Sequence, residues 1–181
     1  KAQSQFQNIK FMQCDALALP FENEFDVVFS NAVFHWIDDH DALLKNVYKV
    51  LKKDGMLICE FGAVGNIASI ENAFAQCSEK LGFEYRPKFN FPTVEIFERN
   101  LKDNGFQIDR IYDYDRLTVL KDGEWGLSNW MKQFFASELA LIPEAVQNDI
   151  IDSVEKLTKD ALWNGREWVA DYRRLRAIAH K

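Results

Sequence analysis

Short runs of apolar residues in the first third of the chain have the length and spacing of strands. Residues 9–13 form such a run and end in a polar turn, which suits a strand of a buried sheet. Residues 25–30 have a continuous centre of β-branched and aromatic side chains, the pattern of a parallel strand covered on both faces. We expect this second strand to be central in its sheet. A third strand is predicted over residues 56–61.

A helix is predicted between the second and third of these strands. Apolar residues recur at helical spacing from Asp41 onward, Asp41 can cap the first turn, and Lys52, Lys53 and Gly55 close the last turn. A strand, a helix and another strand in succession call for a right-handed crossover. The pattern therefore predicts two adjacent parallel strands in an α/β sheet.

The second half of the chain continues this alternation. Two helices are expected before the last strand, one with an apolar stripe from Leu127 to Phe135 and one that starts at Pro143 and whose stripe ends at Leu157. No linker or repeat divides the sequence, so a single domain over residues 1–181 is expected. The other expected elements are helices at 66–81 and 93–104, an aromatic loop at 83–92, and strands at 106–114 and 167–180.

Composition and charge exclude several classes of partner. With 48% hydrophobic residues in 181 positions, the chain is long enough for a globular domain with a sizeable core. The formal net charge of −6 leaves no basic stripe for phosphates, so no nucleic-acid partner is expected. No apolar stretch reaches the length of a membrane span, and no basic segment followed by an apolar run marks a leader. We expect a soluble, cytoplasmic protein whose partner is a small molecule or another protein.

No metal site is expected from the residue pattern. Cys14, Cys59 and Cys77 lie in apolar runs and form no CxxC pair, which indicates reduced core thiols. The three aspartates within residues 38–41 precede a helix, where acidic side chains normally serve the cap and the helix dipole. We therefore interpret both groups as structural.

Three stretches in a fixed order carry a family resemblance. They read CDALALPF at residues 14–21, FDVVFSNAVFHWIDD at 25–39 and LLKNVYKVLKKDGMLICEFGAVGN at 43–66. Together they resemble class I S-adenosylmethionine-dependent methyltransferases, and FSNAVFHW with the later EFG is most similar to the trans-aconitate methyltransferase group. The resemblance implies an α/β, Rossmann-like three-layer sandwich, with a mostly parallel sheet and an antiparallel C-terminal strand.

The resemblance also implies a region upstream of Lys1. The family's first strand, its glycine-rich loop and the acidic residue that holds the cofactor ribose all precede the part that matches here. The segment GAVGN at residues 62–66 follows a later strand and lacks the double-glycine spacing, so it is not that loop. We therefore expect an N-terminally truncated methyltransferase domain that is inactive by itself and binds its cofactor poorly. Such a chain should be marginally stable, self-associate, or need the absent segment supplied from elsewhere.

The implied cofactor is S-adenosyl-L-methionine, at the carboxyl ends of the strands. Ligands of open α/β sheets sit beyond these ends, and Asp15, Asn31 and Gly62 each follow an expected strand. The resemblance implies that Asp15 accepts a hydrogen bond from the adenine amine and that the Ala16 amide donates to a ring nitrogen. The alternative for Asp15 is a turn cap. The residues implied to contact the methionine part, largely through the backbone, are Ser30, Asn31 and Ala32.

The candidates for the acceptor side lie in the next loop and strand end. His35 is the catalytic candidate because it could hydrogen-bond an acceptor or take its proton near neutral pH; the alternative is that it caps or packs the loop. A carboxylate acceptor needs no base. Trp36 could wall the site, but its large apolar area favours the core. Glu60 and Phe61 could face the acceptor.

Other aromatic and histidine residues are assigned more simply. The loop at 83–92, with Tyr85, Phe89 and Phe91, could cover the acceptor or be a surface loop packed on the core. No specific role is expected for His40 or His180. Two functions are left open: methyl transfer to a small-molecule acceptor, with a carboxylate as the candidate, or a catalytically inactive methyltransferase-like interaction module.

Overall fold

The computed structural model describes residues 2–181, with side chains from residue 3 onward. The helices are α1 (Ala2–Gln5), α2 (His40–Val50), α3 (Ala68–Lys80), α4 (Val94–Asp103), α5 (Gly126–Phe134), α6 (Ala136–Leu139) and α7 (Glu144–Leu162), with 3-10 turns η1 (Phe34–Trp36) and η2 (Gly123–Trp125). The strands are β1 (Phe25–Asn31), β2 (Leu51–Gly62), β3 (Gln107–Asp115), β4 (Thr118–Val119), β5 (Val169–Ala170) and β6 (Arg173–His180).

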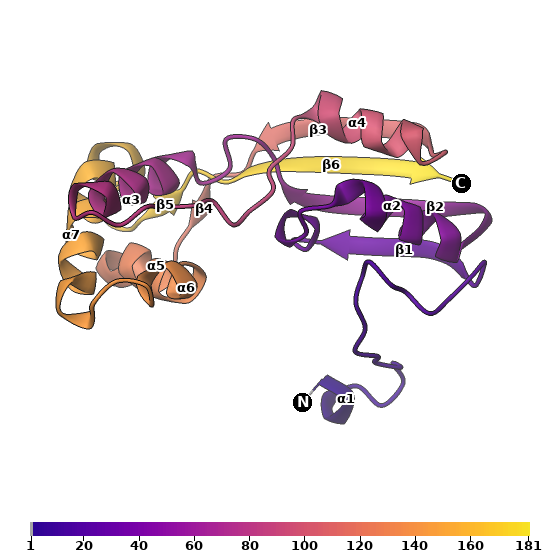
Figure 1. Cartoon of the computed structure of the whole chain (residues 1–181), viewed down its shortest axis with the longest axis horizontal. Helices are drawn as coiled ribbons and strands as arrows, with labels where there is room; N and C mark the ends of the chain where they lie inside the picture. The colour runs from indigo at the N-terminus through magenta and orange to yellow at the C-terminus, as the bar shows by residue number, and fades with distance from the viewer. Residues whose placement is uncertain (1) are drawn as a thin grey trace.

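Four of these strands form one mixed sheet in the order β1-β2-β6-β3 (Figure 1). β1 and β2 are parallel, with Val28 opposite Leu57 and Asn31 opposite Glu60. β6 runs antiparallel to both β2 and β3. The predicted α/β fold, the adjacent parallel strands and the antiparallel C-terminal strand are thus confirmed.

Helices α2 and α4 cover one face of this sheet and form its core with it (Figure 1). Alternate residues of β2 point to that face, so Leu57 and Phe61 are fully buried against Leu44 of α2 and Phe97 of α4. β6 contributes mainly alanines there, which lets the helices approach the sheet closely. Each buried leucine or phenylalanine side chain stabilises the fold by about 1.5–3 kcal/mol.

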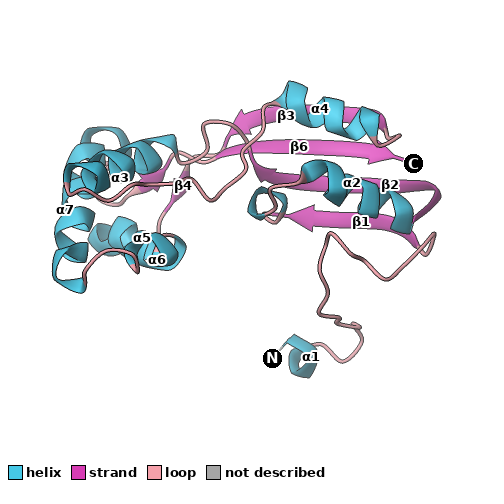
Figure 2. Cartoon of the chain, viewed as in Figure 1, coloured by secondary structure: helices cyan, strands magenta, loops and turns pink. Residues whose placement is uncertain are grey.

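A second hydrophobic cluster lies beyond one end of the sheet, among α3, α5, α6, α7 and the short β4-β5 pair (Figure 2). Phe74 of α3 packs on Phe135, and Ile150 and Val154 of α7 are buried beside them. We call this part the helical lobe. The segment between β5 and β6 connects it to the sheet, and the Nε1–H of Trp130 on α5 donates to the hydroxyl of Tyr172 in that segment, at 2.6 Å.

The strand predicted at residues 9–13 is wrong. This segment is unpaired, and Ile9, Phe11 and Met12 are 51%, 42% and 48% exposed. A strand is stabilised by ladder hydrogen bonds to a neighbour, and within the described residues no strand lies beside this one. For the same reason β1 is an edge strand here rather than the central strand that its apolar pattern predicts.

The face of the sheet opposite α2 and α4 has no helix over it among the described residues. Val27 and Phe29 of β1 point to that face and are 51% and 70% exposed, and Met56 of β2 is 36% exposed. The apolar pattern of β1 is therefore that of a strand with both faces covered, although only one face is covered in residues 2–181.

Several element boundaries differ from the predicted ones. Asp39 caps α2, because its side chain accepts from the Ala42 amide, so Asp41 is not the cap. The helix ends at Val50, and residues 52–55 already belong to β2 rather than closing the helix. Leu157 on α7 is 51% exposed, since the buried stripe of that helix turns toward Thr158 and Leu162.

The expected C-terminal strand at 167–180 is split into β5 and β6 by an unpaired pair of residues. Asp171 in this break binds the start of α3, where its backbone oxygen accepts from the Ile67 amide and its carboxylate accepts from the Ser69 amide. The break thus supplies hydrogen-bond acceptors that satisfy amides at the first turn of a helix, which a continuous strand could not do. The helices expected at 66–81 and 93–104, the loop at 83–92 and the strand at 106–114 are confirmed within one or two residues at most ends.

The cysteine prediction holds for two of three residues. Cys59 and Cys77 are buried, and burial raises the pKa of the Cys59 thiol to about 12, so it stays protonated. Cys14 is exposed, because the segment around it does not enter the sheet. Within residues 2–181, none of the helices has both the length and the apolar character needed to cross a membrane.

Candidate functional site

His35 lies in η1, directly after β1, and is 7% exposed. Its Nδ1 accepts a hydrogen bond of 3.1 Å from the Gly62 amide at the end of β2, and its carbonyl accepts from the Asn90 amide at 2.9 Å. A ring nitrogen that accepts an N–H carries no proton, so the neutral imidazole bears its proton on Nε2. His35 therefore joins two strand ends and the aromatic loop, and Nε2–H remains as its donor.

The environment of His35 keeps its imidazole neutral. Burial lowers its pKa to about 4, assisted by the nearby positive charge of Arg174 and by His40. The sequence suggested a base that takes a proton near neutral pH, and this pKa lies well below that range. Of the two roles expected for His35, the structure favours a hydrogen bond from the neutral ring to an acceptor over proton transfer.

Trp36 follows His35 and is 48% exposed, so the prediction that it fills the core is wrong. Its ring stands edge-on to Phe89, with centroids 4.7 Å apart, and Phe89 stacks on Phe91 at 5.3 Å. Both phenylalanines also contact the His35 ring, at 5.8 and 5.7 Å. The loop at 83–92 thus brings two aromatic rings to the histidine, and Trp36 forms an exposed wall beside them.

Tyr85 does not take part in this wall. It packs against Phe74 and Phe135 of the helical lobe, and its hydroxyl donates to Glu71 at 2.7 Å. For Tyr85, the alternative of a loop residue packed on the core is therefore the correct one.

Glu60 and Phe61 are adjacent on β2 and point to opposite faces of the sheet. Phe61 is fully buried between Phe34 and Phe97, so it does not face an acceptor and that prediction is wrong. Glu60 lies on the face without helices, where it accepts from Arg176 Nε at 2.8 Å and from Arg116 Nη1 at 3.1 Å. Burial raises the pKa of Glu60, but these arginines and the Tyr114 hydroxyl outweigh it and lower the pKa overall.

Asp15 and Ala16 lie in the segment that the sequence assigned to a strand end. Asp15 is exposed, and its Oδ1 accepts from the Leu17 amide at 2.9 Å, which is the turn-capping geometry weighed as the alternative. Ala16 is half-buried and packs on the core beneath α2. The Leu17 carbonyl accepts from Asn46 of α2 at 2.7 Å, which holds this turn against the helix.

Ser30, Asn31 and Ala32 end β1 as predicted. Ala32 adopts a left-handed backbone conformation, with φ of 57°, and its amide donates to the Glu60 carbonyl at 2.8 Å. A non-glycine residue in this region is uncommon and is held here by that hydrogen bond. The chain therefore turns sharply at the carboxyl end of β1, and Asn31 is left exposed there.

His40 is structural in a way that the sequence did not indicate. It is 3% exposed, its ring stands edge-on to Phe61 and Phe97, and its Nε2 lies 3.0 Å from the Phe34 carbonyl. His180, by contrast, pairs at the surface with Asp109. The described residues contain no cluster of three or more metal-ligating side chains.

The sequence analysis also missed Arg174, the second residue of β6. It lies opposite Gly62 in the sheet and close enough to His35 to lower its pKa. No periodicity distinguishes it, because the segment RRLR has three arginines and the structure pairs two of them elsewhere. Its position becomes visible only from the pairing of β6 with β2.

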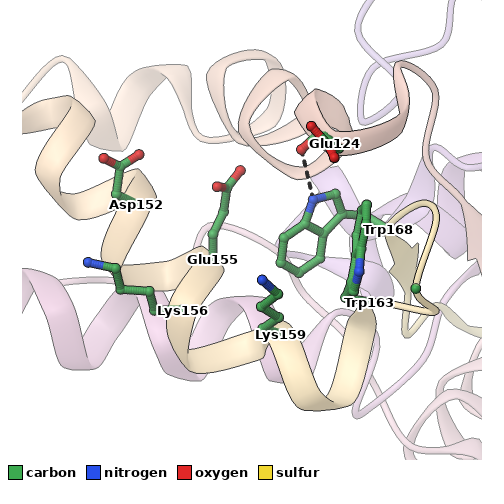
Figure 3. Close-up of a pocket in the computed structure, with 8 residues that line it drawn as sticks. Glu124, Asp152, Glu155, Lys156, Lys159, Trp163 and Trp168 are labelled. Carbon is green, nitrogen blue, oxygen red and sulfur yellow. Dashed lines mark hydrogen bonds between the residues drawn. The ribbon is translucent and has the colours of Figure 1, made fainter.

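A cavity of about 600 Å³ lies in the helical lobe, away from this site (Figure 3). It is lined by Trp163 and Trp168 at one end and by charged residues of α7 along its length. The Trp168 indole donates to the Glu124 carbonyl at 2.9 Å. None of its lining residues lies in the three stretches between residues 14 and 66 that carry most of the family resemblance.

Comparison with known proteins agrees with the fold. A family model described as a methyltransferase domain matches residues 1–59. An uncharacterized methyltransferase of Schizosaccharomyces pombe is 32% identical over an alignment of 181 positions. The alignment covers 92% of this chain and 66% of that protein. By sequence, the chain is therefore similar to methyltransferases. A demethylmenaquinone methyltransferase of Staphylococcus aureus is 28% identical over 55% of this chain and 48% of its own length.

The solved structures that resemble this chain do so in fold. A methyltransferase-type protein from Bacillus halodurans has a TM-score of 0.63 and 14% identity, covering 99% of this chain and 74% of its own. The [4+2]-cyclase SpnF has a TM-score of 0.53 and 16% identity, covering 99% and 58%. The chain thus spans about half to two thirds of the length of the curated relatives described above.

Proposed function

We propose that the complete protein transfers a methyl group from S-adenosyl-L-methionine to a small-molecule acceptor, with a carboxylate as the acceptor class. The observation that carries this proposal is the pairing of η1 with the end of β2 through His35 and Gly62. It places a neutral, buried hydrogen-bond donor at the carboxyl ends of two parallel strands, where open α/β sheets bind their ligands. The family match covers the first of these strand ends and most of the second strand.

The turn at Asp15 and the end of β1 offer the groups that would hold the cofactor. Asp15 is exposed and the turn uses Oδ1, so Oδ2 is available to accept from an exocyclic amine. Asp15 and Ala16 would hold the adenine, and Ser30, Asn31 and Ala32 would contact the methionine part. When bound, S-adenosylmethionine supplies a methyl group on a sulfonium, which a carboxylate can attack without losing a proton.

The protein's part is then to align the acceptor and to exclude water. In-line displacement depends strongly on alignment, and a neutral His35 Nε2–H can donate to one carboxylate oxygen while the other oxygen reacts. Trp36, Phe89 and Phe91 provide an apolar wall beside it. This role suits an imidazole whose pKa is about 4 far better than a role as general base does.

The alternative is a methyltransferase-like module without catalysis, and transfer assays decide between the two. The complete protein, supplied with radiolabelled S-adenosylmethionine and a panel of carboxylates, should label at least one of them. His35→Asn keeps an oxygen acceptor for the Gly62 amide but loses the Nε2 donor. It should lower kcat while leaving the Kd for the cofactor nearly unchanged.

Two results would contradict the proposal. A complete protein that binds the cofactor but labels none of the carboxylates and none of their uncharged analogues favours the interaction module. A His35→Asn variant with unchanged kcat and an unchanged pH profile makes His35 a packing residue alone.

A further inference from the structure

Three arginines lie together on the face of the sheet that has no helix over it. Arg116 and Arg176 both form ion pairs with Glu60, and Tyr114 donates to the same carboxylate at 2.8 Å. Glu60 is 9% exposed, so its two oxygens are occupied by these three partners. Arg174 is the third arginine, and within residues 2–181 its guanidinium has no hydrogen-bonded or ion-paired acceptor.

Arg174 is nevertheless firmly placed. Its guanidinium lies over the ring of Tyr172 at 4.9 Å, and Tyr172 is held in turn by the Trp130 indole from the helical lobe. The Nε atom of Arg174 is buried and has no partner among the described residues. A buried N–H of a charged group without an acceptor is costly, so this side chain has hydrogen-bonding capacity that the described residues leave unused.

Arg174 also lies next to the candidate acceptor site. It is opposite Gly62 in the β2-β6 ladder, and the Gly62 amide is the donor to His35. Its charge acts on the His35 imidazole directly. An anion bound by Arg174 would therefore lie beside the neutral donor of His35 and the apolar wall of Trp36 and Phe89.

We propose that Arg174 binds the carboxylate of the methyl acceptor, with its forked guanidinium donating to the oxyanion beside His35. This assignment rests on the proposed function, because it places the acceptor at the same site. The two terminal NH2 groups of the guanidinium can donate to the two oxygens of a carboxylate. A phosphate shares this chemistry, so the test must separate the two.

The test uses the complete protein and three aromatic probes of similar size: cinnamate, cinnamamide and phenyl phosphate. Calorimetry should show cinnamate binding at least about tenfold more tightly than cinnamamide, because only the carboxylate forms a charge-assisted pair with the guanidinium. Arg174→Gln should remove this preference. Arg173→Gln is the matched control, because Arg173 is the adjacent residue and is already paired with Asp113 and Asp115.

A second readout follows the imidazole of His35 by NMR. Arg174→Gln should raise the pKa of His35, and so should saturation with cinnamate, because each removes or screens the nearby positive charge. Arg174→Lys keeps the charge but loses the fork, so it should retain a low pKa for His35 and bind cinnamate with intermediate affinity. If thermal melting shows that Arg174→Gln does not fold, Arg174→Lys takes its place in the test.

Equal affinity for cinnamate and cinnamamide, or an equal loss of affinity in the Arg173 and Arg174 variants, would overturn the assignment. Tighter binding of phenyl phosphate than of cinnamate would replace the carboxylate by a phosphate and overturn the acceptor class. Selective binding of cinnamate through Arg174, with no transfer to any member of the panel, would keep Arg174 as a carboxylate-binding residue while refuting the proposed function.

Discussion

The imidazole Nδ1 of His35 accepts the backbone N–H of Gly62, and this single contact of 3.1 Å joins the turn after β1 to the end of the neighbouring strand. Gly62 has no side chain, and the space that a Cβ would fill is occupied by the ring of Phe91. Phe91 also contacts His35. One glycine therefore allows a strand end, a histidine and the aromatic loop to meet.

We predict that Gly62→Ala destabilises the fold by about 1–3 kcal/mol, the usual cost of overpacking. The added Cβ would lie 2.6 Å from Phe91 Cδ1, so the ring must move away from His35 and Phe89. Urea unfolding of the variant measures the change in the free energy of unfolding.

Phe91→Leu in the Gly62→Ala background provides the control. The smaller side chain should recover part of the lost stability, because the clash involves this ring. Gly82→Ala is a comparison without a clash, since no atom lies within 4 Å of its Cβ position, although its positive φ still strains an alanine. A Gly62→Ala variant with the same free energy of unfolding as the wild type would show that the loop repacks freely.

The low pKa of His35 predicts a loss of stability in acid. The folded protein keeps this imidazole neutral down to pH about 4, whereas the unfolded chain takes up a proton below about 6.5. Stability should be unaffected by this group above pH 6.5 and fall as the pH drops from 6.5 toward 4, by up to about 3 kcal/mol. Burial also lowers the pKa of His40, which acts in the same direction.

Chemical unfolding of the wild type and of His35→Asn between pH 4.5 and 7.5 measures this slope. Asparagine cannot take up the proton but keeps an acceptor for the Gly62 amide, so the variant should lose less stability on acidification. Parallel slopes for the two proteins would show that His35 has an ordinary pKa.

The parallel pairing of β1 with β2 could be predicted from the sequence, and the antiparallel direction of β6 from the family resemblance, but the position of residues 9–13 could not. Residues 25–30 and 56–61 carry enough apolar side chains to bury against α2 and α4, whichever other strands are present. Residues 9–13 have a strand-like pattern too, yet a strand needs a partner for its backbone groups, and the described residues supply none.

The candidate site was predictable at its strand ends and not in its side-chain partners. His35 and Trp36 were found from the run that follows β1, but the burial of one and the exposure of the other depend on a loop that is more than fifty positions away in the chain. Arg174 was missed because the sequence does not show which arginine is left without an acceptor. Only the structure shows that Glu60 is already occupied by two other arginines.

Asp15→Ala should weaken binding of S-adenosylmethionine to the complete protein by about 1.5–3 kcal/mol, if the carboxylate accepts from the adenine amine. The same substitution also removes the cap on the Leu17 amide, so a loss of stability must be separated from a loss of affinity. Asp15→Asn makes this separation, because its amide oxygen can still cap the turn but carries no charge. Calorimetry with equal affinity in the wild type and both variants would make Asp15 a turn residue alone.

The 181-residue chain by itself should associate through the uncovered face and free edge of β1. Val27 and Phe29 are 51% and 70% exposed on adjacent positions of that face, and β1 pairs on one side only, with β2. An open strand edge beside exposed apolar side chains favours pairing between chains. Light scattering after size exclusion should show dimers or larger species, and Val27→Thr with Phe29→Thr should shift them toward monomer.

Leu117→Thr is the matched control, since Leu117 is as exposed as Phe29 but lies outside the four-stranded sheet, so it should leave the distribution unchanged. A wild-type chain that stays monomeric at high concentration would show that this face is stable in water as it stands.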